Sequence, residues 1–174
     1  SYTLIYSIIF FHNIIKMKKE TCLITGITGM VGSHLADYLL ENTDWDIHGM
    51  CRWRSPQDNI EHLIPRVNAQ NRIFFHYGDL CDYISLQNVI EIVRPDYVFH
   101  LAAQSFPQTS FTSPISTFDA NIQGTENLLE TFVRAGQKAL ELRSKGLKTV
   151  IKADNTPVTN ADMEVDKQIK EKLI

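Results

Sequence analysis

Residues 21–35, TCLITGITGMVGSHL, run from a short apolar segment through three spaced glycines into a helical pattern. Glycine lets a backbone turn tightly, approach a ligand closely and pack a helix against a strand, which explains Gly26, Gly29 and Gly32. Free N–H groups at the start of such a helix attract a phosphate. The spacing is G-x-x-G-x-x-G rather than the commoner G-x-G-x-x-G, so the interpretation depends on the flanking strand and helix. The stretch predicts a turn that holds the pyrophosphate of a dinucleotide.

The composition limits the size and the partners of the protein. With 174 residues, 44% of them hydrophobic and 21% charged, the chain has enough material for one globular core but not for a large two-domain enzyme. A formal net charge of -3 and a pI of about 6.0 argue against binding to nucleic acid or to a membrane surface through general electrostatics. We therefore expect neither nucleic acid nor a membrane as a partner.

Cysteine and histidine do not form a metal-binding pattern. Cys22, Cys51 and Cys81 are odd in number, lack C-x-x-C spacing and lie in or beside predicted strands, which predicts reduced, buried thiols in a cytosolic protein. The histidines of the predicted framework also lack metal spacing, and we expect ordinary structural or surface roles for His34, His48, His62, His76 and His100. No metal site is predicted from these residues.

Strands and helices alternate along the chain. Apolar runs predict strands at 20–25, 46–52, 72–77 and 95–103, the last covered on both faces because it is almost continuously apolar. Helices are expected at 30–41, at 59–63 with a stop at Pro65, after an N-cap at Asp82, and from Ser113-Pro114 onward. This order predicts a doubly wound α/β fold of the Rossmann type, a right-handed parallel sheet with four main strands and a helical tail.

Helical periodicity predicts which side chains of each helix are buried. For the helix 30–41 the predicted stripe is Val31, Leu35, Tyr38 and Leu39. For the helix after Asp82 it is Leu86, Val89, Ile90 and Val93. For the helix that begins at Pro114 it is Phe118, Ile122, Thr125, Leu128, Leu129 and Phe132.

The end of the second predicted strand indicates which dinucleotide is bound. Folds of this type place there an Asp or Glu that binds the ribose hydroxyls of NAD. This sequence instead has Arg52 and Arg54 with Ser55, and a guanidinium suits the 2′-phosphate of NADP. NADP is therefore favoured over NAD, while a solvated basic loop without a ligand is the alternative.

Two further turns follow strands and are candidate contacts. Gly78-Asp79-Leu80 offers a carboxylate and a backbone turn to an adenine ring. The nearby Asp82 is also explained as the N-cap of the following helix, a role that needs no ligand. Ala102 and Ala103, at the end of the fourth strand, are small and leave room for a cofactor.

Four segments in this order resemble the extended short-chain dehydrogenase/reductase family, in its nucleotide-sugar-modifying branch. They cover residues 19 to about 130 and are LITGITGMVGSHL at 23–35, YGDL at 77–80, HLAAQS at 100–105 and NIQGTENLLE at 121–130. The ITGITG run, Arg52 and the AQS run are most similar to the GDP-mannose 4,6-dehydratases. That resemblance implies hydride transfer from C4 of the sugar to NADP, loss of water across C5 and C6, and return of the hydride at C6.

The resemblance also implies roles for individual residues. The pyrophosphate would be held by Gly26, Thr28, Gly29, Met30 and Gly32. Arg52 would bind the 2′-phosphate, Asp79 and Leu80 the adenine, and Leu101, Ala102, Ala103 and Gln104 the ribose and nicotinamide side. Ser105 would face the nucleotide sugar, and Asn121 would support the site, unless it merely bonds neighbouring backbone.

The resemblance stops before the catalytic part of the family. No Tyr follows Glu130, so the Tyr-x-x-x-Lys pair that supplies the general base is absent, and about forty residues cannot form a substrate domain. We expect residues 17–134 to be a truncated NADP-binding domain that is inactive alone, with no catalytic residues. A missing fifth strand would leave an open edge beside the fourth unless the tail covers it, which would favour aggregation or homo-oligomers.

Residues 135–174 resemble a different family, the start of the inositol monophosphatase superfamily and especially its 3′(2′),5′-bisphosphate nucleotidases. The pattern predicts a helix at 135–142, a strand at 149–152, and a turn at 152–162 into a second helix with Val165, Ile169 and Leu173. The turn, DNTPVTNAD at 154–162, would place Asp154, Thr159 and Asp162 near magnesium-bound water. Too few carboxylates are present to hold Mg²⁺, so a capped helix with solvated acids explains these residues better.

The apolar segment 1–16 precedes Met17. It is too short for a membrane span and has no positive charge ahead of it as a signal peptide would, so we expect a non-native or disordered leader. Three hypotheses remain: the NADP-binding part of a nucleotide-sugar dehydratase, a fragment of a magnesium-dependent nucleotidase, and a dinucleotide-binding module without catalysis.

Overall fold

The computed structural model describes residues 19–144, 149–151 and 157–159. The chain divides into two compact units between Leu128 and Leu129. The expected leader at 1–16, Asp154, Asp162 and the helix expected around Val165 lie outside the described residues.

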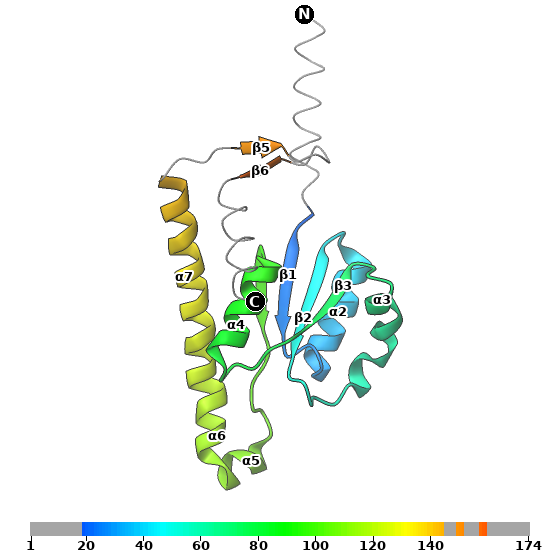
Figure 1. Ribbon diagram of the computed structural model, residues 1–174. Helices are drawn as coiled ribbons and strands as arrows, with labels where there is room; N and C mark the ends of the chain where they lie inside the picture. Colours follow the sequence, from blue (N-terminus) through cyan, green and yellow to red (C-terminus); the bar gives the residue numbers. More distant parts are fainter. Residues whose placement is uncertain (1–18, 145–148, 152–156, 160–174) are drawn as a thin grey trace, which may run out of the picture. The chain divides into compact units, whose positions relative to one another are not determined.

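The first unit is built on a parallel sheet, as the sequence predicted. Its strands are β1 (Thr21–Thr25), β2 (Asp46–Cys51), β3 (Ile73–Tyr77) and β4 (Tyr97–His100), in the order β3-β2-β1-β4 (Figure 1). The chain therefore moves outward from β1 through β2 to β3 and then returns to the other side of β1. Such a reversal opens a crevice at the carboxyl ends of the strands, where α/β proteins bind their ligands.

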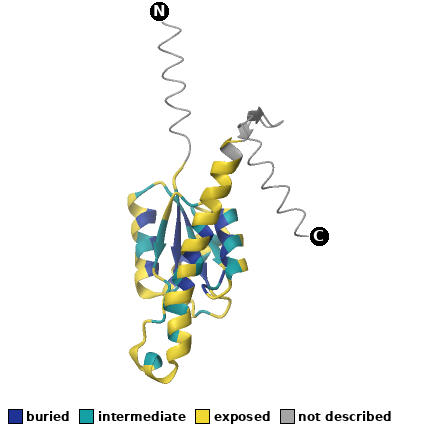
Figure 2. Cartoon of the chain, turned by 90° about the vertical axis from the view of Figure 1, so that its left-hand side faces the viewer, coloured by how far each residue is buried: buried dark blue, intermediate teal, exposed yellow. Residues whose placement is uncertain are grey.

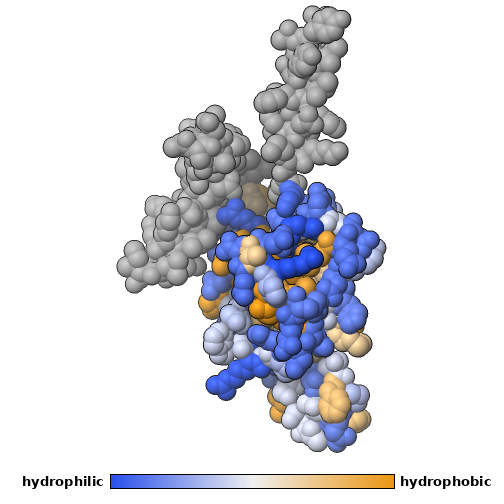
Figure 3. All heavy atoms as spheres, turned by 90° about the vertical axis from the view of Figure 1, so that its right-hand side faces the viewer, coloured by the Kyte–Doolittle hydropathy of each residue, from blue (hydrophilic) through white to orange (hydrophobic). Residues whose placement is uncertain are grey.

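Helices lie on both faces of this sheet, with α2 and α3 on one side and α4 on the other (Figure 1). The helical elements of the described residues are α2 (Met30–Asn42), the 3₁₀-helix η1 (Asp58–Leu63), α3 (Ile64–Asn68), α4 (Tyr83–Val93), α5 (Pro107–Thr112), α6 (Pro114–Phe118), the π-helix η2 (Asp119–Gln123) and α7 (Gly124–Ser144). The doubly wound α/β fold is confirmed. Seen from the side of α3, the surface is mainly hydrophilic with smaller apolar areas (Figure 3).

The main core lies between the sheet and α2. It is formed by strand residues together with α2 and η1, namely Cys22, Ile24, Ile47, Cys51 and Ile73 with Ala36, Leu39, Leu40, Ile60 and Leu63. The buried positions gather on the strands and on the inner sides of the helices (Figure 2). Alternate strand residues face opposite sides of a sheet, and the second face is covered by α4, whose predicted stripe of Leu86, Val89, Ile90 and Val93 is buried.

The predicted buried stripe of α2 is wrong in part. Val31 and Tyr38 are exposed, whereas the buried residues of α2 are Gly32, Ser33, Ala36, Leu39 and Leu40. Small side chains face the sheet because the start of the helix packs directly on the glycine turn. The positions of the hydrophobic residues alone predict a buried face of α2 that is rotated away from the face that contacts the sheet.

Proline and the π-helix account for the other differences among the helices. Pro65 does not stop a helix but lies in the first turn of α3, a position that suits its fixed φ. The long helix predicted from Pro114 contains η2, whose wider turn changes the phase of the stripe. Phe118, Ile122 and Leu129 are exposed, while Leu128 is buried as predicted. Ser113 precedes α6 as expected, but its side chain forms no capping bond, and α5 was not predicted.

Two strands and one cysteine also differ from the predictions. β4 is shorter than expected, and its residues are exposed at Tyr97 and half-buried beyond it rather than covered on both faces. Pro157–Thr159, expected within a turn, is strand β6 and pairs antiparallel with β5 (Thr149–Ile151). Proline is tolerated at the first position of a strand. Cys22 and Cys51 are buried free thiols as predicted, but Cys81 is exposed because it lies in the turn before α4.

Arg72 holds the carboxyl end of α2 in place. Its guanidinium donates hydrogen bonds to the carbonyl oxygens of Leu40, Thr43 and Trp45. The backbone of Arg72 has a positive φ of 63°. The last carbonyls of a helix have no partner within the helix, and a cation there also interacts favourably with the helix dipole. Arg72 therefore fixes the end of α2 opposite to the glycine turn.

Replacing Arg72 by methionine should destabilise this unit. The Arg72→Met variant loses three charge-assisted donors, so we expect the free energy of unfolding to fall by about 2–3 kcal/mol in urea titrations. Arg66→Met is the matched control, because Arg66 is an exposed residue of α3 and its loss should change the stability by less than about 0.5 kcal/mol. Equal stability of the two variants would contradict the role of Arg72.

Two of the histidines that the sequence left separate are paired across β2 and β3. His48 Nδ1 and His76 Nε2 lie 2.8 Å apart, so one proton is shared between them, and His48 also stacks on Phe74. Burial and the neighbouring His76 lower the pKa of His48 from 6.5 to about 4, and burial lowers the pKa of His76. The pair is therefore held without positive charge at neutral pH.

This pair should make the stability fall in acid. Because the folded-state pKa of His48 is below that of an unfolded histidine, the unfolded chain binds more protons between pH 6.5 and about 4. The stabilising contribution is complete above pH 6.5 and decreases as the pH falls toward 4, by about 2 kcal/mol. Urea titrations between pH 6.5 and 4 measure this loss of unfolding free energy. A His48→Asn variant whose stability falls equally steeply with pH would refute the assignment of the loss to His48.

Candidate functional site

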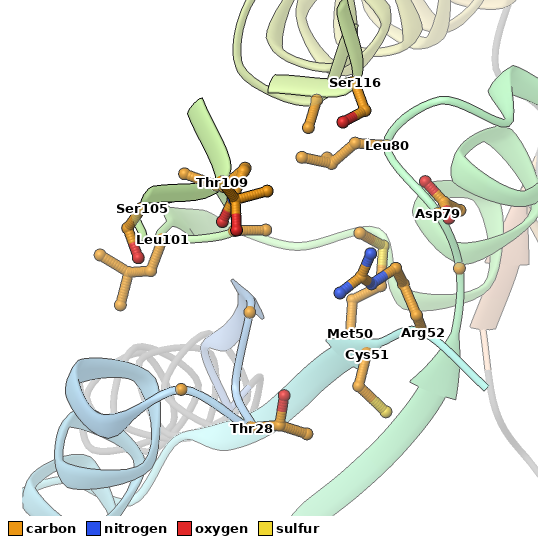
Figure 4. A pocket seen from close by; sticks show the side chains of 17 residues that line it. Thr28, Met50, Cys51, Arg52, Asp79, Leu80, Leu101, Ser105, Thr109 and Ser116 are labelled. Atoms are coloured by element: carbon orange, nitrogen blue, oxygen red, sulfur yellow. The ribbon is translucent and has the colours of Figure 1, made fainter. Parts of the chain in front are cut away.

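A cavity of about 510 Å³ opens at the carboxyl ends of the strands, at the point where the strand order reverses. Its walls come from the loops after β1, β2, β3 and β4 and from α5, α6 and η2 (Figure 4). The lining residues are Gly26, Thr28, Gly29, Met50, Cys51, Arg52, Gly78, Asp79, Leu80, Leu101, Ala102, Ala103, Gln104, Ser105, Thr109, Ser116 and Ala120. This size is typical of a small-molecule or cofactor site.

The three glycines of the first turn have different steric functions. Gly26 has a φ of +76°, and a Cβ there would lie 2.8 Å from Ala102 Cα. A Cβ on Gly32 would lie 2.4 Å from the carbonyl oxygen of Gly26, so Gly32 allows α2 to pack on the turn. A Cβ on Gly29 would meet only the Gly26 oxygen, at 3.3 Å. Gly26 and Gly32 thus serve the packing, and Gly29 keeps the backbone accessible from the cavity.

The start of α2 provides unpaired amide groups beside this turn. The first i→i−4 bond of the helix runs from Ser33 N to Gly29 O, so the amides before it have no such partner within the helix. No acidic residue lies in the first turn of α2, and its N-cap is Gly29 without a side-chain bond. Asn59 of η1 donates to the Thr28 carbonyl at 2.9 Å and steadies the turn. The arrangement suits an anion such as a pyrophosphate.

The loop after β3 forms a second wall. Asp79 accepts a hydrogen bond from Cys81 N at 2.9 Å, and Asp82 caps α4 by accepting from the amides of Ile84 and Ser85, as predicted. Asn127 Nδ2 donates to the Leu80 carbonyl at 2.9 Å. A Cβ on Gly124 would lie 2.6 Å from Leu80 Cβ, so this glycine permits the close contact of its helix with the loop.

The loop after β4 forms the opposite wall and is bonded more extensively than the sequence indicated. Asn121 accepts from Gln104 N at 2.7 Å and donates to Gln104 O at 3.0 Å. The buried Thr25 hydroxyl accepts from the amides of Leu101 and Ala102 and lies 2.7 Å from His100 Nδ1. Asn121 was named from the sequence only as a supporting residue, and Thr25 and His100 were missed, because no motif reports a contact between residues 75 positions apart.

The predicted site residues are brought together in the cavity with two exceptions. Met30 is exposed at the start of α2 and Gly32 is buried beneath it, so neither lines the cavity. Arg52 extends into the cavity from the end of β2, whereas Arg54 is not among the lining residues (Figure 4). Thr109 and Ser116, two hydroxyl residues of α5 and α6 opposite the glycine turn, were not predicted.

Known proteins with similar sequences share this first unit and part of the second. The family model for GDP-mannose 4,6 dehydratase matches residues 23–145. This chain belongs to that family. The chain is 42% identical to GDP-mannose 4,6-dehydratase of Vibrio cholerae serotype O1 over 117 residues, which are 66% of this chain and 31% of the relative. It is 39% identical to the human GDP-mannose 4,6 dehydratase over 123 residues, 68% of this chain and 32% of the relative.

Among solved structures, UDP-glucose 4-epimerase of Thermus thermophilus, in complex with NAD, is similar with a TM-score of 0.57 and 26% identity. The match covers 67% of this chain and 34% of the epimerase. The chain thus spans about a third of the length of the GDP-mannose 4,6-dehydratases that it matches.

Two other kinds of site are absent from the part of the chain that the structure describes. No group of three or more His, Cys, Asp or Glu side chains there could hold a metal ion. No described helix is both long and apolar enough to cross a membrane.

Gly32 provides a test of the packing of α2. In Gly32→Ala the new methyl group would meet the Gly26 carbonyl and the Ile27 backbone, so we expect the free energy of unfolding to fall by about 1–3 kcal/mol. The control is Gly136→Ala, since a Cβ there meets nothing within 4 Å and alanine favours the helix. Chemical denaturation of both variants checks this, and a Gly32→Ala variant as stable as the parent would be inconsistent with the contact.

Proposed function

We propose that this chain is the dinucleotide-binding part of a nucleotide-sugar dehydratase, with NADP as cofactor and GDP-mannose as the sugar nucleotide of the whole enzyme. The observation that carries the proposal is the position of Arg52, whose side chain enters the cavity from the end of β2. Residues 50–55, MCRWRS, contain no carboxylate that could bind both ribose hydroxyls of NAD. A guanidinium there favours the 2′-phosphate of NADP through paired charge-assisted hydrogen bonds.

The other walls suit the rest of this cofactor. The turn at Gly26, Thr28 and Gly29 would hold the pyrophosphate with the amides of α2, and the backbone that Gly29 keeps accessible from the cavity supports this fit. Asp79 and Leu80 would contact the adenine, and the residues 101–104 the ribose and nicotinamide. When bound, NADP would supply a hydride acceptor for the sugar and return the hydride later.

The chain's own residues would bind and orient the reactants rather than transfer protons. Ser105 and Thr109 present hydroxyl groups beside Leu101, where a nucleotide sugar would lie, whereas Ser116 lies beside Leu80 (Figure 4). No Tyr follows Glu130 in the sequence, so we assign no general base to this chain. A cytosolic location and a homo-oligomer belong to the same proposal, because they follow from the enzyme class and not from the geometry.

The nucleotidase alternative has less support. The match to the dehydratase family continues to residue 145, and Asp154 and Asp162, on which the alternative depends, lie outside the described residues. Hydrolysis of adenosine 3′,5′-bisphosphate by the chain would revive it.

Nucleotide selectivity tests the proposal. Arg52→Ala should raise the Kd of NADPH about 10- to 100-fold and leave that of NADH nearly unchanged, because only NADPH carries the 2′-phosphate. Arg54→Ala removes an equal charge outside the cavity lining and should change either Kd less than about threefold. Fluorescence titration measures both ligands. Equal affinities of the parent protein for NADPH and NADH, or no binding of either, would overturn the proposal.

A further inference from the structure

A continuous chain of hydrogen bonds connects the glycine turn to η2 through His100. His100 Nδ1 lies 2.7 Å from Thr25 Oγ1, and His100 Nε2 lies 3.1 Å from Thr125 Oγ1. Thr125 Oγ1 in turn donates to the Asn121 carbonyl at 2.8 Å. The imidazole thus joins the ends of β1 and β4 to the helix that carries Asn121.

The partners of the two hydroxyl groups determine the proton positions on His100. Thr125 gives its only hydroxyl proton to Asn121 O, so it must accept a proton from His100 Nε2. The Thr25 hydroxyl oxygen accepts from Ala102 N at 3.3 Å and from Leu101 N at 3.2 Å, an amide that it shares with the Thr25 backbone carbonyl. The hydroxyl proton of Thr25 is therefore directed to His100 Nδ1. His100 is therefore neutral with the proton on Nε2.

Protonation of His100 would disrupt this arrangement. A second proton on Nδ1 would face a Thr25 oxygen that already accepts two amide protons. Burial also lowers the pKa of His100. Each bond of the chain has a defined direction, and the amides fixed at one end belong to Leu101 and Ala102 in the cavity wall.

We propose that neutral His100 is a positioning residue that fixes residues 101–104 and so shapes the nicotinamide end of the cavity without acting on the adenine end. This inference rests on the proposed NADP site. Thr25 and Asn121 hold the two ends of the 101–104 segment. His100 orients the Thr25 hydroxyl directly and is connected through Thr125 to the backbone carbonyl of Asn121.

The end of the cavity proposed for the adenine, at Leu80, is held by contacts with other residues of the helix that carries Thr125. Asn127 donates to the Leu80 carbonyl, and Gly124 permits the approach of that helix to Leu80. Neither contact includes His100, Thr25 or Thr125. The two ends of the cavity can therefore be disturbed separately, which makes the role of His100 measurable.

Two ligands distinguish the two ends. NADPH should contact both, whereas adenosine 2′,5′-bisphosphate lacks the nicotinamide half and should contact only the adenine end. We expect His100→Phe, which fills the space but removes both hydrogen bonds, to raise the Kd of NADPH at least tenfold and that of adenosine 2′,5′-bisphosphate less than twofold. His100→Asn restores an acceptor near the position of Nδ1 and should recover part of the NADPH affinity. Asn127→Ala is the matched control and should weaken both ligands alike.

The outcomes separate this inference from the proposed function. If the parent protein binds neither ligand, the NADP site itself is refuted. If the parent binds both and His100→Phe changes both affinities equally, or neither, the NADP site stands and the positioning role is refuted. Retained binding of adenosine 2′,5′-bisphosphate also shows that the variant is folded.

A measurement on the unmodified protein tests the same inference without a variant. The ¹⁵N chemical shifts of the His100 ring at pH 7 should show a protonated Nε2 and an unprotonated Nδ1. A proton on Nδ1 would overturn the proposal, because it reverses the hydrogen bond between His100 and Thr25 and directs a third proton at the Thr25 oxygen that accepts from Leu101 N and Ala102 N.

Discussion

The close approach of the glycine turn to the end of β4 is the constraint on which the cavity depends. A single methyl group at Gly26 would reach Ala102 Cα, and one at Gly32 would reach the Gly26 carbonyl. Strand β1, helix α2 and the loop after β4 therefore meet at almost bare backbone. Because interiors of proteins are close-packed, a side chain at either glycine has to displace an entire element rather than a flexible neighbour. The position of α2, and with it the direction of its free amides, follows from this contact.

Much of the fold could be predicted because local patterns and the overall fold agree. The strands, the parallel sheet and the buried face of α4 follow from apolar runs, from a capping Asp82 and from regular helical spacing. The predicted buried faces of the helices were wrong where packing did not follow the usual preference for hydrophobic residues on the buried face. α2 turns Gly32, Ser33 and Ala36 toward the sheet, and η2 inserts a wide turn that no residue type announces. Periodicity measures hydrophobicity, and neither close backbone packing nor a π-turn has a hydrophobic signature.

The loops that form the candidate site could be predicted from the sequence. Most of the side-chain contacts within the site could not. The glycine turn, Arg52 and the loops after β3 and β4 could be located because parallel strands bring their carboxyl ends to one edge of the sheet. The roles of Thr25, His100 and Thr125 could not be predicted, because their hydrogen bonds join residues that are distant in sequence. Threonine and histidine are also common polar residues that do not by themselves indicate a site. Met30 and Gly32 were included by analogy with the motif, although one is exposed outside the cavity and the other is buried below it.

The hydrogen bonds of Arg72 at the carboxyl end of α2 have a consequence for the anion binding proposed at the opposite end of the helix. The Arg72 guanidinium bonds the carbonyls of Leu40 in the last turn of α2, of the C-cap residue Thr43 and of Trp45 beyond the helix, and so ties this end of α2 to the start of β3. The amino-terminal amides of α2 are consequently ordered before any anion arrives. The entropy of ordering them is lost during folding, so less of the attraction between helix and phosphate is consumed on association. In the proposed NADP site, Arg72 would thereby contribute to affinity through preorganisation, although it does not line the cavity.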